Sequence, residues 1–240
     1  MMDDQTVRKL NAINRTFYET VADEFDATRQ NWWPGWERLL DYIPLKDGLS
    51  ILDIGCGNGR FGLFLAERLP VHIHYAGIDN NLSLLETAES ALAQHAQISA
   101  TLIEADVVTR LPLNNSYDLV VAFGLLHHIP GGANRLAFAR HLASFVAPRG
   151  NLAFASWRFY EHERFRQRIV PWPPELADAV EHHDYLLDWR RGTVALRYCH
   201  YVDNAEQQAL ITATDLQPII TYRADGESGD LNAYSILKRT

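Results

Sequence analysis

Apolar residues first recur at helical spacing near the N-terminus. Between Val7 and Phe25 they stand mostly three or four positions apart, which is the period of one helix face. The tryptophan-rich stretch Asp26–Trp36 contains a Pro-Gly pair and is predicted to be a loop, and Glu37–Tyr42 is predicted to be a short helix. Residues 1–45 are therefore predicted to form a helical N-terminal cap.

Strand and helix patterns then alternate through residues 50–157. Short apolar runs, each ending near a glycine or an acid, predict five strands, and longer periodic segments predict the helices between them. The strands are Ser50–Ile54, Ile73–Ile78, Ile98–Glu104, Tyr117–Phe123 and Asn151–Trp157, and the helices are Arg60–Arg68, Leu82–Gln94 and Asn134–Val146. This alternation predicts a doubly wound, mostly parallel α/β sheet whose ligand lies beyond the carboxyl ends of the strands.

The pattern breaks down after the fifth strand. From Arg158 to Gly192, aromatic residues, charges and three prolines follow one another irregularly, so residues 158–195 are predicted to be an irregular insert or lid. Residues 196–240 then carry an extended stretch, a helix and an antiparallel hairpin. These elements are Arg197–Tyr201, Asn204–Thr214 with Asp203 as its cap, and the strands Pro218–Tyr222 and Ala233–Leu237. Residues 1–240 are thus predicted to be a single domain with seven strands.

Composition agrees with one globular domain. The chain has 240 residues, of which 47% are hydrophobic, and this is enough for one α/β core with additions. The net charge of −8 argues against nonspecific nucleic-acid binding, so an RNA site would have to gather arginines locally. Two cysteines exclude a disulfide framework and predict a reducing, cytoplasmic location. No apolar run is long enough to span a bilayer, and we expect no membrane partner.

A glycine loop follows the first predicted strand. Residues Gly55–Gly59 have the spacing G-x-G-x-G, whereas dinucleotide sites need G-x-G-x-x-G. Asp53 precedes the loop, where a carboxylate would repel a pyrophosphate but would suit a ligand with an ammonium group. Two later strand ends carry Asp79, which can bind the hydroxyls of a ribose, and Asp106, which can accept from an adenine amine. These features disfavour a nicotinamide dehydrogenase, which stays an alternative.

Four segments together resemble the class I S-adenosylmethionine-dependent methyltransferases. They are ILDIGCGNGRFGLFL from Ile51, GIDNN from Gly77, EADV from Glu104 and YDLVVAFGLLHHI from Tyr117. The resemblance implies a Rossmann-like fold and S-adenosyl-L-methionine as cofactor, with S-adenosyl-L-homocysteine as product. It also implies the cofactor-binding residues, which are Tyr18, Asp53, Gly55, Cys56, Gly57, Asp79, Asn80, Asp106, Val107 and Gly124.

A narrower resemblance lies largely outside that core. The segments FYETVADEFDATRQNWWPGW from Phe17 and RYCHYVDNAEQQAL from Arg197, with the pair His127-His128, are similar to the tRNA wobble-uridine carboxymethyl methyltransferases. The chain departs from that family at Asn31-Trp32, where Lys-Pro is usual, and at Cys199, where a tyrosine is usual. The resemblance implies a tRNA substrate and, because eukaryotic relatives use one, a small zinc-binding activating partner.

The catalytic residues depend on the acceptor. A carboxylate is already ionised near neutral pH and needs only an arginine to orient it, and the family motif offers Arg29 and Arg197. A hydroxyl or amine acceptor would need a base, for which His127 or His128 is placed. Two alternatives remain open: a methyltransferase acting on a small-molecule acceptor, and a cofactor-binding subunit without catalysis.

Three further groups have candidate roles. The tryptophans Trp32, Trp33 and Trp36 could stack on a base or fill the core. Four arginines of the insert could bind phosphate, namely Arg158, Arg164, Arg166 and Arg168. The run Glu181–Asp184 contains metal-ligand residue types but is predicted to be a solvated surface, and no metal site is predicted.

Overall fold

A computed structural model describes residues 2–27, 31–107, 115–191 and 193–240 of the chain. Arg29, one of the two predicted carboxylate clamps, lies outside the described residues. Within the described part, no helix is long and apolar enough to cross a membrane.

Seven strands form one mostly parallel sheet, as predicted. Their order is β3-β2-β1-β4-β5-β10-β9, and β10 runs antiparallel to both of its neighbours. The strands are β1 (Leu49–Ile54), β2 (Ile73–Asp79), β3 (Ile98–Glu104), β4 (Tyr117–Ala122), β5 (Val146–Trp157), β9 (Gln217–Ala224) and β10 (Asn232–Lys238). The chain order reverses between β1 and β4, so the carboxyl ends of these strands flank a crevice that can take a ligand.

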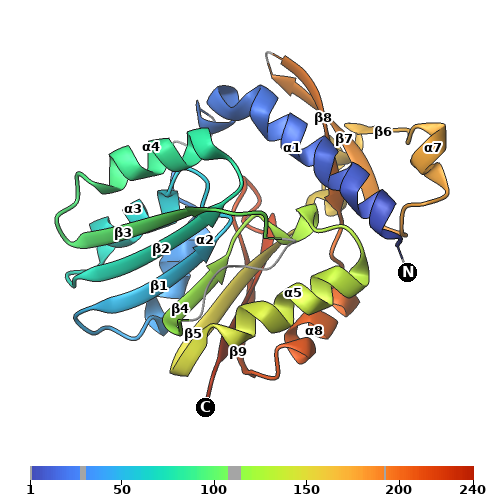
Figure 1. The fold of residues 1–240 in the computed structure, drawn as a ribbon. Helices are drawn as coiled ribbons and strands as arrows, with labels where there is room; N and C mark the ends of the chain where they lie inside the picture. Colours follow the sequence, from blue (N-terminus) through green and yellow to red (C-terminus); the bar gives the residue numbers. More distant parts are fainter. Residues whose placement is uncertain (1, 28–30, 108–114, 192) are drawn as a thin grey trace.

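Helices cover both faces of this sheet (Figure 1). Side chains alternate across a strand, so Ile51 of β1 packs with one set of helices and Leu52 with the other. The first face carries α2 (Pro34–Leu39), α3 (Arg60–Arg68) and α4 (Leu82–Leu92), and the second carries α5 (Gly132–Ser144) and α8 (Asn204–Ala213). The Asp203 side chain caps α8 by accepting a hydrogen bond from the Glu206 backbone N–H, as predicted.

The N-terminal cap differs from its prediction at the tryptophan-rich stretch. The first helix, α1 (Asp4–Ala27), extends past Phe25, and α2 already begins at Pro34. A proline is favoured in the first turn of a helix, where its missing N–H costs no hydrogen bond. The Pro-Gly pair therefore begins a helix, and the prediction of a loop up to Trp36 was wrong for its last three residues.

The insert is not irregular, and that prediction was wrong. It contains a second, antiparallel sheet made of β6 (Ile169–Val170), β7 (Asp184–Arg191) and β8 (Thr193–His200), together with two short helices, α6 (Glu163–Arg166) and α7 (Pro174–Ala177). Tyr198 packs against Leu10 of α1, whereas Cys199 packs against Phe159. Both faces are covered where Tyr198 and Cys199 lie, whereas Val194 and Leu196 of β8 are apolar and exposed, so the strands lack the polar–apolar alternation that would mark them in the sequence.

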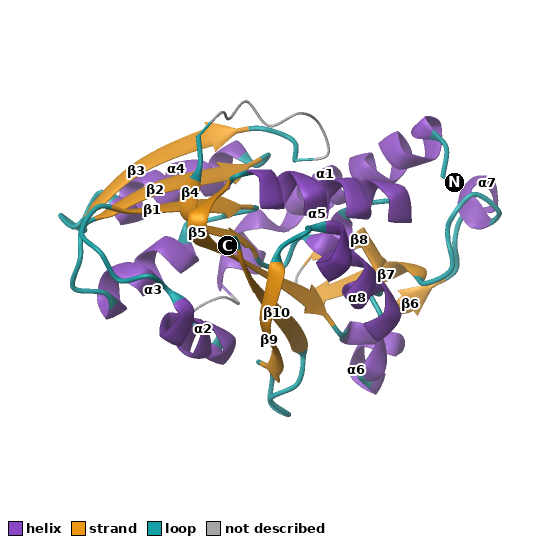
Figure 2. Cartoon of the chain, turned by 90° about the horizontal axis from the view of Figure 1, so that it is seen from below, coloured by secondary structure: helices purple, strands orange, loops and turns teal. Residues whose placement is uncertain are grey.

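Figures 1 and 2 show this second sheet beside the carboxyl-end edge of the main sheet, with α1 lying across it. A buried polar network joins the two parts. His200 hydrogen bonds to Asp184 at 2.7 Å and to Glu206 of α8 at 2.6 Å, and Arg135 of α5 pairs with Glu206 at 2.6 Å. Burial opposes ionisation of Glu206, yet its bonds to His200 and the Arg135 charge lower its pKa to about 2.

The same network corrects the prediction for the run Glu181–Asp184. Asp184 is buried and also accepts a hydrogen bond from the Tyr198 hydroxyl at 2.8 Å, while Glu181 accepts one from the Gly132 backbone N–H at 2.8 Å. Although burial lowers the pKa of His200, its bonds to Asp184 and Glu206 raise it above the usual value. These two acids therefore hold the second sheet against the core and are not a solvated surface.

Candidate active site

A glycine loop connects β1 to α3 at the carboxyl edge of the main sheet. Gly55 has a φ of 79°, and a Cβ placed there would approach Leu125 to 3.2 Å, so a glycine is required at this position. The Gly57 backbone N–H donates a hydrogen bond to Asp79 at 2.8 Å, and the Asn81 backbone N–H donates one at 3.0 Å. The carboxylate that ends β2 thus holds the loop that follows β1.

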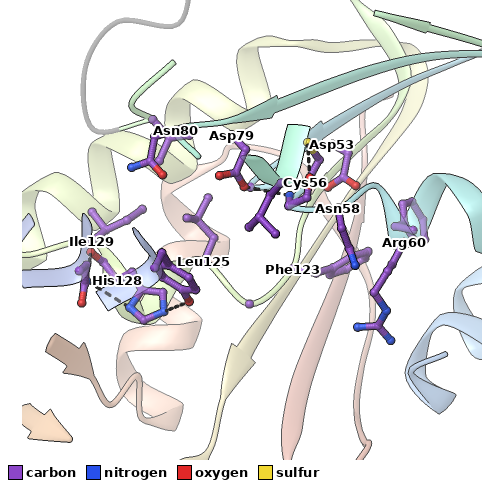
Figure 3. Close-up of a pocket in the computed structure, with 18 of the residues that line it drawn as sticks. Asp53, Cys56, Asn58, Arg60, Asp79, Asn80, Phe123, Leu125, His128 and Ile129 are labelled. Atoms are coloured by element: carbon purple, nitrogen blue, oxygen red, sulfur yellow. Dashed lines mark hydrogen bonds between the residues drawn. The ribbon is translucent and has the colours of Figure 1, made fainter. Parts of the chain in front are cut away.

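A cavity of about 180 Å³ lies beside this loop (Figure 3). All ten residues predicted to bind the cofactor line it, and they come from α1 and from four successive strand ends. They are Tyr18, Asp53, Gly55, Cys56, Gly57, Asp79, Asn80, Asp106, Val107 and Gly124. Figure 3 shows Asp53, Cys56 and Asp79 close together, whereas His128 and Ile129 lie across the cavity from them.

The Asp53 carboxylate is buried at the end of β1. The Tyr75 hydroxyl donates a hydrogen bond to it at 2.6 Å, and no arginine, lysine or histidine of the described residues pairs with it. Burial raises the pKa of Asp53 to about 7, although the Tyr75 hydrogen bond lowers it and the Asp79 charge adds to the rise. A ligand that brings an ammonium group into the cavity would supply the missing positive charge.

Several lining residues were missed by sequence reasoning. Asn11 and Asn14 line the cavity from the same face of α1 as Tyr18, so their spacing of three and four residues was the signal that could have found them. Phe123 and Leu125 flank Gly124 after β4, and Leu84 comes from α4. These apolar side chains carry no polar signal, and only the packing shows that they enclose a ligand.

A second, larger cavity of about 610 Å³ adjoins the first. Tyr18, Trp33, Arg60 and Gly124 line both cavities and so form the boundary between them. The remaining walls come mainly from the insert and from the β9–β10 turn. They include His127, Trp157, Arg164, Phe165, Arg168, Trp189, Arg197, Asp225 and Glu227. Its volume lies within the range of roughly 300–1,000 Å³ that is usual for pockets binding small ligands.

Arg197 lies in the wall of this second cavity. Its side chain is buried, and its guanidinium carbon lies 4.7 Å from the Trp157 ring centre, 5.4 Å from Phe17 and 6.0 Å from Trp189. No carboxylate among the described residues lies within ion-pairing distance of it. The aromatic rings hold a cation in place while its charge stays available to a ligand.

The two histidines face different cavities. His127 lines the second cavity, and its ring centre lies 5.1 Å from that of Trp157. His128 lines the first, and its Nδ1 lies 3.0 Å from the carbonyl oxygen of Tyr198. Nδ1 also lies 3.2 Å from the amide nitrogen of Asn14, and Nε2 lies 2.8 Å from the Tyr18 hydroxyl. His128 therefore positions Tyr18 at the boundary, and a role of either histidine as a base stays a prediction.

His127, His128 and Cys199 bring three metal-ligand atoms within 4.8 Å of one another. Burial raises the pKa of the Cys199 thiol to about 12, although the nearby Arg197 charge lowers it, so the thiol is protonated at neutral pH. A cation there would also have to displace the hydrogen bonds of His128. The geometry favours a hydrogen-bonded, packed cluster over a metal centre.

Some of the tryptophans and insert arginines are buried in the fold, and others line a cavity. Trp36 is buried in the main core, whereas Trp33 lines both cavities. Arg158 is buried and donates to the Val202 carbonyl at 2.8 Å, and Arg166 donates to the Tyr160 carbonyl at 2.8 Å. Of the four insert arginines that were candidates for binding phosphate, Arg164 and Arg168 line the second cavity, so the four do not form one patch.

The first cavity suits a nucleoside that carries an ammonium group. The buried carboxylate of Asp53, which has no cationic partner among the described residues, lies at one position, and neighbouring strand ends carry the carboxylates of Asp79 and Asp106. A family model described as a methyltransferase domain matches residues 51–150, which contain the glycine loop and these three acids. The chain is an S-adenosylmethionine-dependent methyltransferase.

Curated relatives of this methyltransferase support the assignment. A protein of Encephalitozoon cuniculi (strain GB-M1) named as a methyltransferase is 27% identical over 199 residues, which cover 83% of this chain and 84% of the relative. A tRNA (carboxymethyluridine(34)-5-O)-methyltransferase of Saccharomyces cerevisiae is 26% identical over 70% of this chain and 59% of its own length. A trans-aconitate 2-methyltransferase of Azoarcus sp. (strain BH72) is 32% identical over 59% of this chain and 53% of its own length. The matched part of this chain thus covers little more than half the length of the Saccharomyces and Azoarcus relatives.

Solved methyltransferase structures share the fold. A methyltransferase from Clostridium acetobutylicum has a TM-score of 0.67 at 12% identity, covering 92% of this chain and 98% of that one. The N-methyltransferase NodS from Bradyrhizobium japonicum, in complex with S-adenosyl-L-homocysteine, has a TM-score of 0.58 at 19% identity and covers 98% of this chain and 99% of that one. The likeness extends beyond residues 51–150 to nearly the whole chain.

The protonation of Asp53 should control cofactor binding. At pH values below about 7 Asp53 of the free methyltransferase is protonated, so the affinity for S-adenosylhomocysteine should fall by about tenfold for each further pH unit. Asp53→Asn should weaken binding and remove this dependence, which titration calorimetry across the range measures. The folded pKa lies above the ordinary value of 3.8, so Asp53 lowers the stability of the free fold progressively as the pH rises from about 3.8 to about 7, and above that the loss stays constant. Asp53→Asn should therefore raise the melting temperature at alkaline pH.

Tyr75→Phe is the matched variant for this test. It removes the hydrogen bond that lowers the pKa of Asp53 and should shift the midpoint of the pH dependence upward. A wild-type affinity that does not change with pH would show that Asp53 does not meet the ammonium group.

Gly124 separates the two cavities and should not tolerate a side chain. Its φ is 69°, and a Cβ there would lie 3.3 Å from Trp33 Cη2, so Gly124→Ala should displace the boundary. We expect kcat to fall on the order of 100-fold, as a displacement of about 1 Å between reacting groups can cause. Gly229→Ala is the control, because Gly229 has a φ of 72° and nothing within 4 Å. Equal activity of the two variants would contradict the boundary role.

Proposed function

We propose that this methyltransferase transfers its methyl group to a carboxylate and so forms a methyl ester. The acceptor that we favour is the carboxymethyl group of a modified wobble uridine in tRNA. The observation that carries the proposal is Arg197, a buried guanidinium that lines the second cavity and has no carboxylate partner among the described residues. A buried cation without a partner is costly unless a ligand supplies the opposite charge.

The chemistry of the second cavity suits an acceptor that is already anionic. When bound in the first cavity, S-adenosylmethionine supplies an electrophilic methyl group on a sulfonium and takes back the electron pair of the broken carbon–sulfur bond. A carboxylate has lost its proton near neutral pH, so Arg197 needs only to orient its oxygens. Trp157 and Trp189 pack around the guanidinium and exclude water from it.

Residues at the boundary between the two cavities have supporting roles in the proposed reaction. Tyr18, held by His128, and Trp33, packed against Gly124, limit the opening between the cavities. Such an opening must be narrow, because only a methyl group has to pass between the two ligands. This proposal needs no residue that removes a proton, so His127 only forms part of the wall of the second cavity.

The names of two relatives also specify carboxylate acceptors. The yeast relative is named for a carboxymethyl group on uridine, and the Azoarcus relative is named for trans-aconitate, which is itself a carboxylic acid. The wobble uridine is favoured because the resemblance to the tRNA enzymes includes Arg197-Tyr198 and His127-His128, which lie in or beside the two cavities. A small carboxylic acid is the second candidate, supported by the identity to the Azoarcus relative. An activating partner and a cytoplasmic location stay predictions.

Base lability of the product tests the carboxylate itself. The enzyme is incubated with methyl-labelled cofactor and either tRNA that carries the carboxymethyl wobble uridine or small carboxylic acids. A methyl ester releases labelled methanol in mild alkali, whereas an N-methyl group or a methyl ether keeps its label. Label that resists alkali on every acceptor would exclude carboxylate methylation. Nucleoside mass spectrometry of tRNA from cells lacking the protein then separates the acceptors, because an unchanged level of esterified wobble uridine would favour the small acid.

Arg197→Lys should separate orientation of the acceptor from cofactor binding. Lysine keeps the charge but not the two-pronged contact, so kcat/KM should fall by about 10- to 100-fold, in line with the roughly 1.5–3 kcal/mol of a charge-assisted hydrogen bond. The affinity for S-adenosylhomocysteine should stay unchanged. Arg166→Lys is the control, because Arg166 bonds to the Tyr160 carbonyl and lines neither cavity. Equal losses of turnover and cofactor affinity in Arg197→Lys would contradict the role.

A further inference from the structure

The second cavity carries more positive charge than one carboxylate acceptor needs. Among the described residues, four arginines line it, Arg60, Arg164, Arg168 and Arg197, and two acids do so, Asp225 and Glu227. This excess is local, because the whole chain has a net charge of −8. A cavity wall concentrates the field of the charges that line it and attracts a ligand of opposite sign.

The Asp225 carboxylate is already occupied by hydrogen bonds within the protein. One oxygen accepts from the Gly35 backbone N–H at 2.8 Å, and the other accepts from the Asn232 amide at 2.7 Å and the Tyr234 hydroxyl at 2.6 Å. These bonds attach the start of α2 to the β9–β10 turn. Asp225 therefore serves the fold, and it is not directed at the arginines of the cavity.

Arg164 and Arg168 form a pair around one aromatic ring. Their guanidinium carbons lie 4.8 Å and 5.9 Å from the centre of the Phe165 ring. The carboxylate that approaches Arg164 is Glu227, at 3.9 Å, and its side chain is 94% exposed. An exposed ion pair at that distance contributes little, so Glu227 does not neutralise Arg164 strongly. The ring restricts both side chains in advance, which lowers the cost of binding an anion.

We infer that the acceptor carries a second anionic group, which Arg164 and Arg168 bind at the insert side of the second cavity. This inference rests on the proposed function, in which Arg197 takes the carboxylate that becomes methylated. The two arginines then determine specificity, because they select acceptors that have an anion at a second position. That anion is a phosphate if the acceptor is part of a nucleic acid, or a second carboxylate if it is a small polyacid.

Binding and turnover of matched acceptors test this inference. The nucleotide pair is carboxymethyluridine and its 5′-monophosphate, and the acid pair is a tricarboxylic acid and a monocarboxylic acid of the same chain length. The wild-type enzyme, saturated with cofactor, should have a lower KM for the acceptor with the second anion in either the nucleotide pair or the acid pair. The Arg164→Gln, Arg168→Gln double variant should raise KM for that acceptor by about tenfold or more, because it removes two charge-assisted contacts, and should leave KM for its partner unchanged. A preference within the nucleotide pair identifies a phosphate, and one within the acid pair identifies a carboxylate.

Arg166→Gln is the control, because it removes one arginine charge from α6, the short helix that also carries Arg164, at a position outside the cavity. The inference is overturned if the wild-type enzyme prefers neither double anion, if the double variant loses turnover equally on all four acceptors, or if Arg166→Gln has the same effect. Melting temperatures and S-adenosylhomocysteine affinity confirm that the double variant is folded. Failure of the proposed function looks different, because no acceptor would then yield an alkali-labile methyl group.

Discussion

Two buried charges of opposite sign, each facing a cavity and neither neutralised by a described residue, are the constraint on which this site depends. Asp53 ends β1 and lines the first cavity, and Arg197 lies on β8 and lines the second cavity. Burying such a charge costs stability unless a partner compensates for it. In the proposed reaction each ligand would bring the missing charge, an ammonium group for Asp53 and a carboxylate for Arg197, and so offset this cost.

The insert, together with the rest of β8, supplies much of the wall of the second cavity. Strand β8 supplies Arg197, strand β7 supplies Trp189, and the segment before them supplies Arg164 and Arg168. These positions are useful only if the small sheet keeps a constant place relative to β4 and Gly124. The buried bonds from His200 to Asp184 and Glu206, with Arg135 beside them, connect that sheet to α5 and α8. Removing one member would leave a buried charge unpaired, so the network favours a single arrangement.

In the proposed function, the distribution of charge would let an acidic protein bind an anionic acceptor. Acids line the first cavity, and arginines line the second. The boundary between the two cavities is made of Tyr18, Trp33, Arg60 and Gly124. Each cavity therefore has its own sign, whatever the net charge of the surface. An estimate from net charge alone would assign this protein no affinity for phosphate or carboxylate.

The main sheet and the succession of strands and helices along the chain could be predicted from the sequence, and so could the residues at the strand ends that line the first cavity. This was possible because these features are local: hydrophobic period, glycine spacing and one acid at the end of each strand all lie within short segments. The sequence also selected Arg197, though only through a family motif, and it could not show that the side chain is buried among three aromatic rings. The second sheet, the burial of Asp184 and Arg158, and the second cavity were decided by tertiary structure alone. Segments distant in the chain cover both faces of the second sheet where Tyr198 and Cys199 lie, and Val194 and Leu196 are apolar although they are exposed. Burial and side-chain polarity therefore leave no periodic signal in the sequence of these strands.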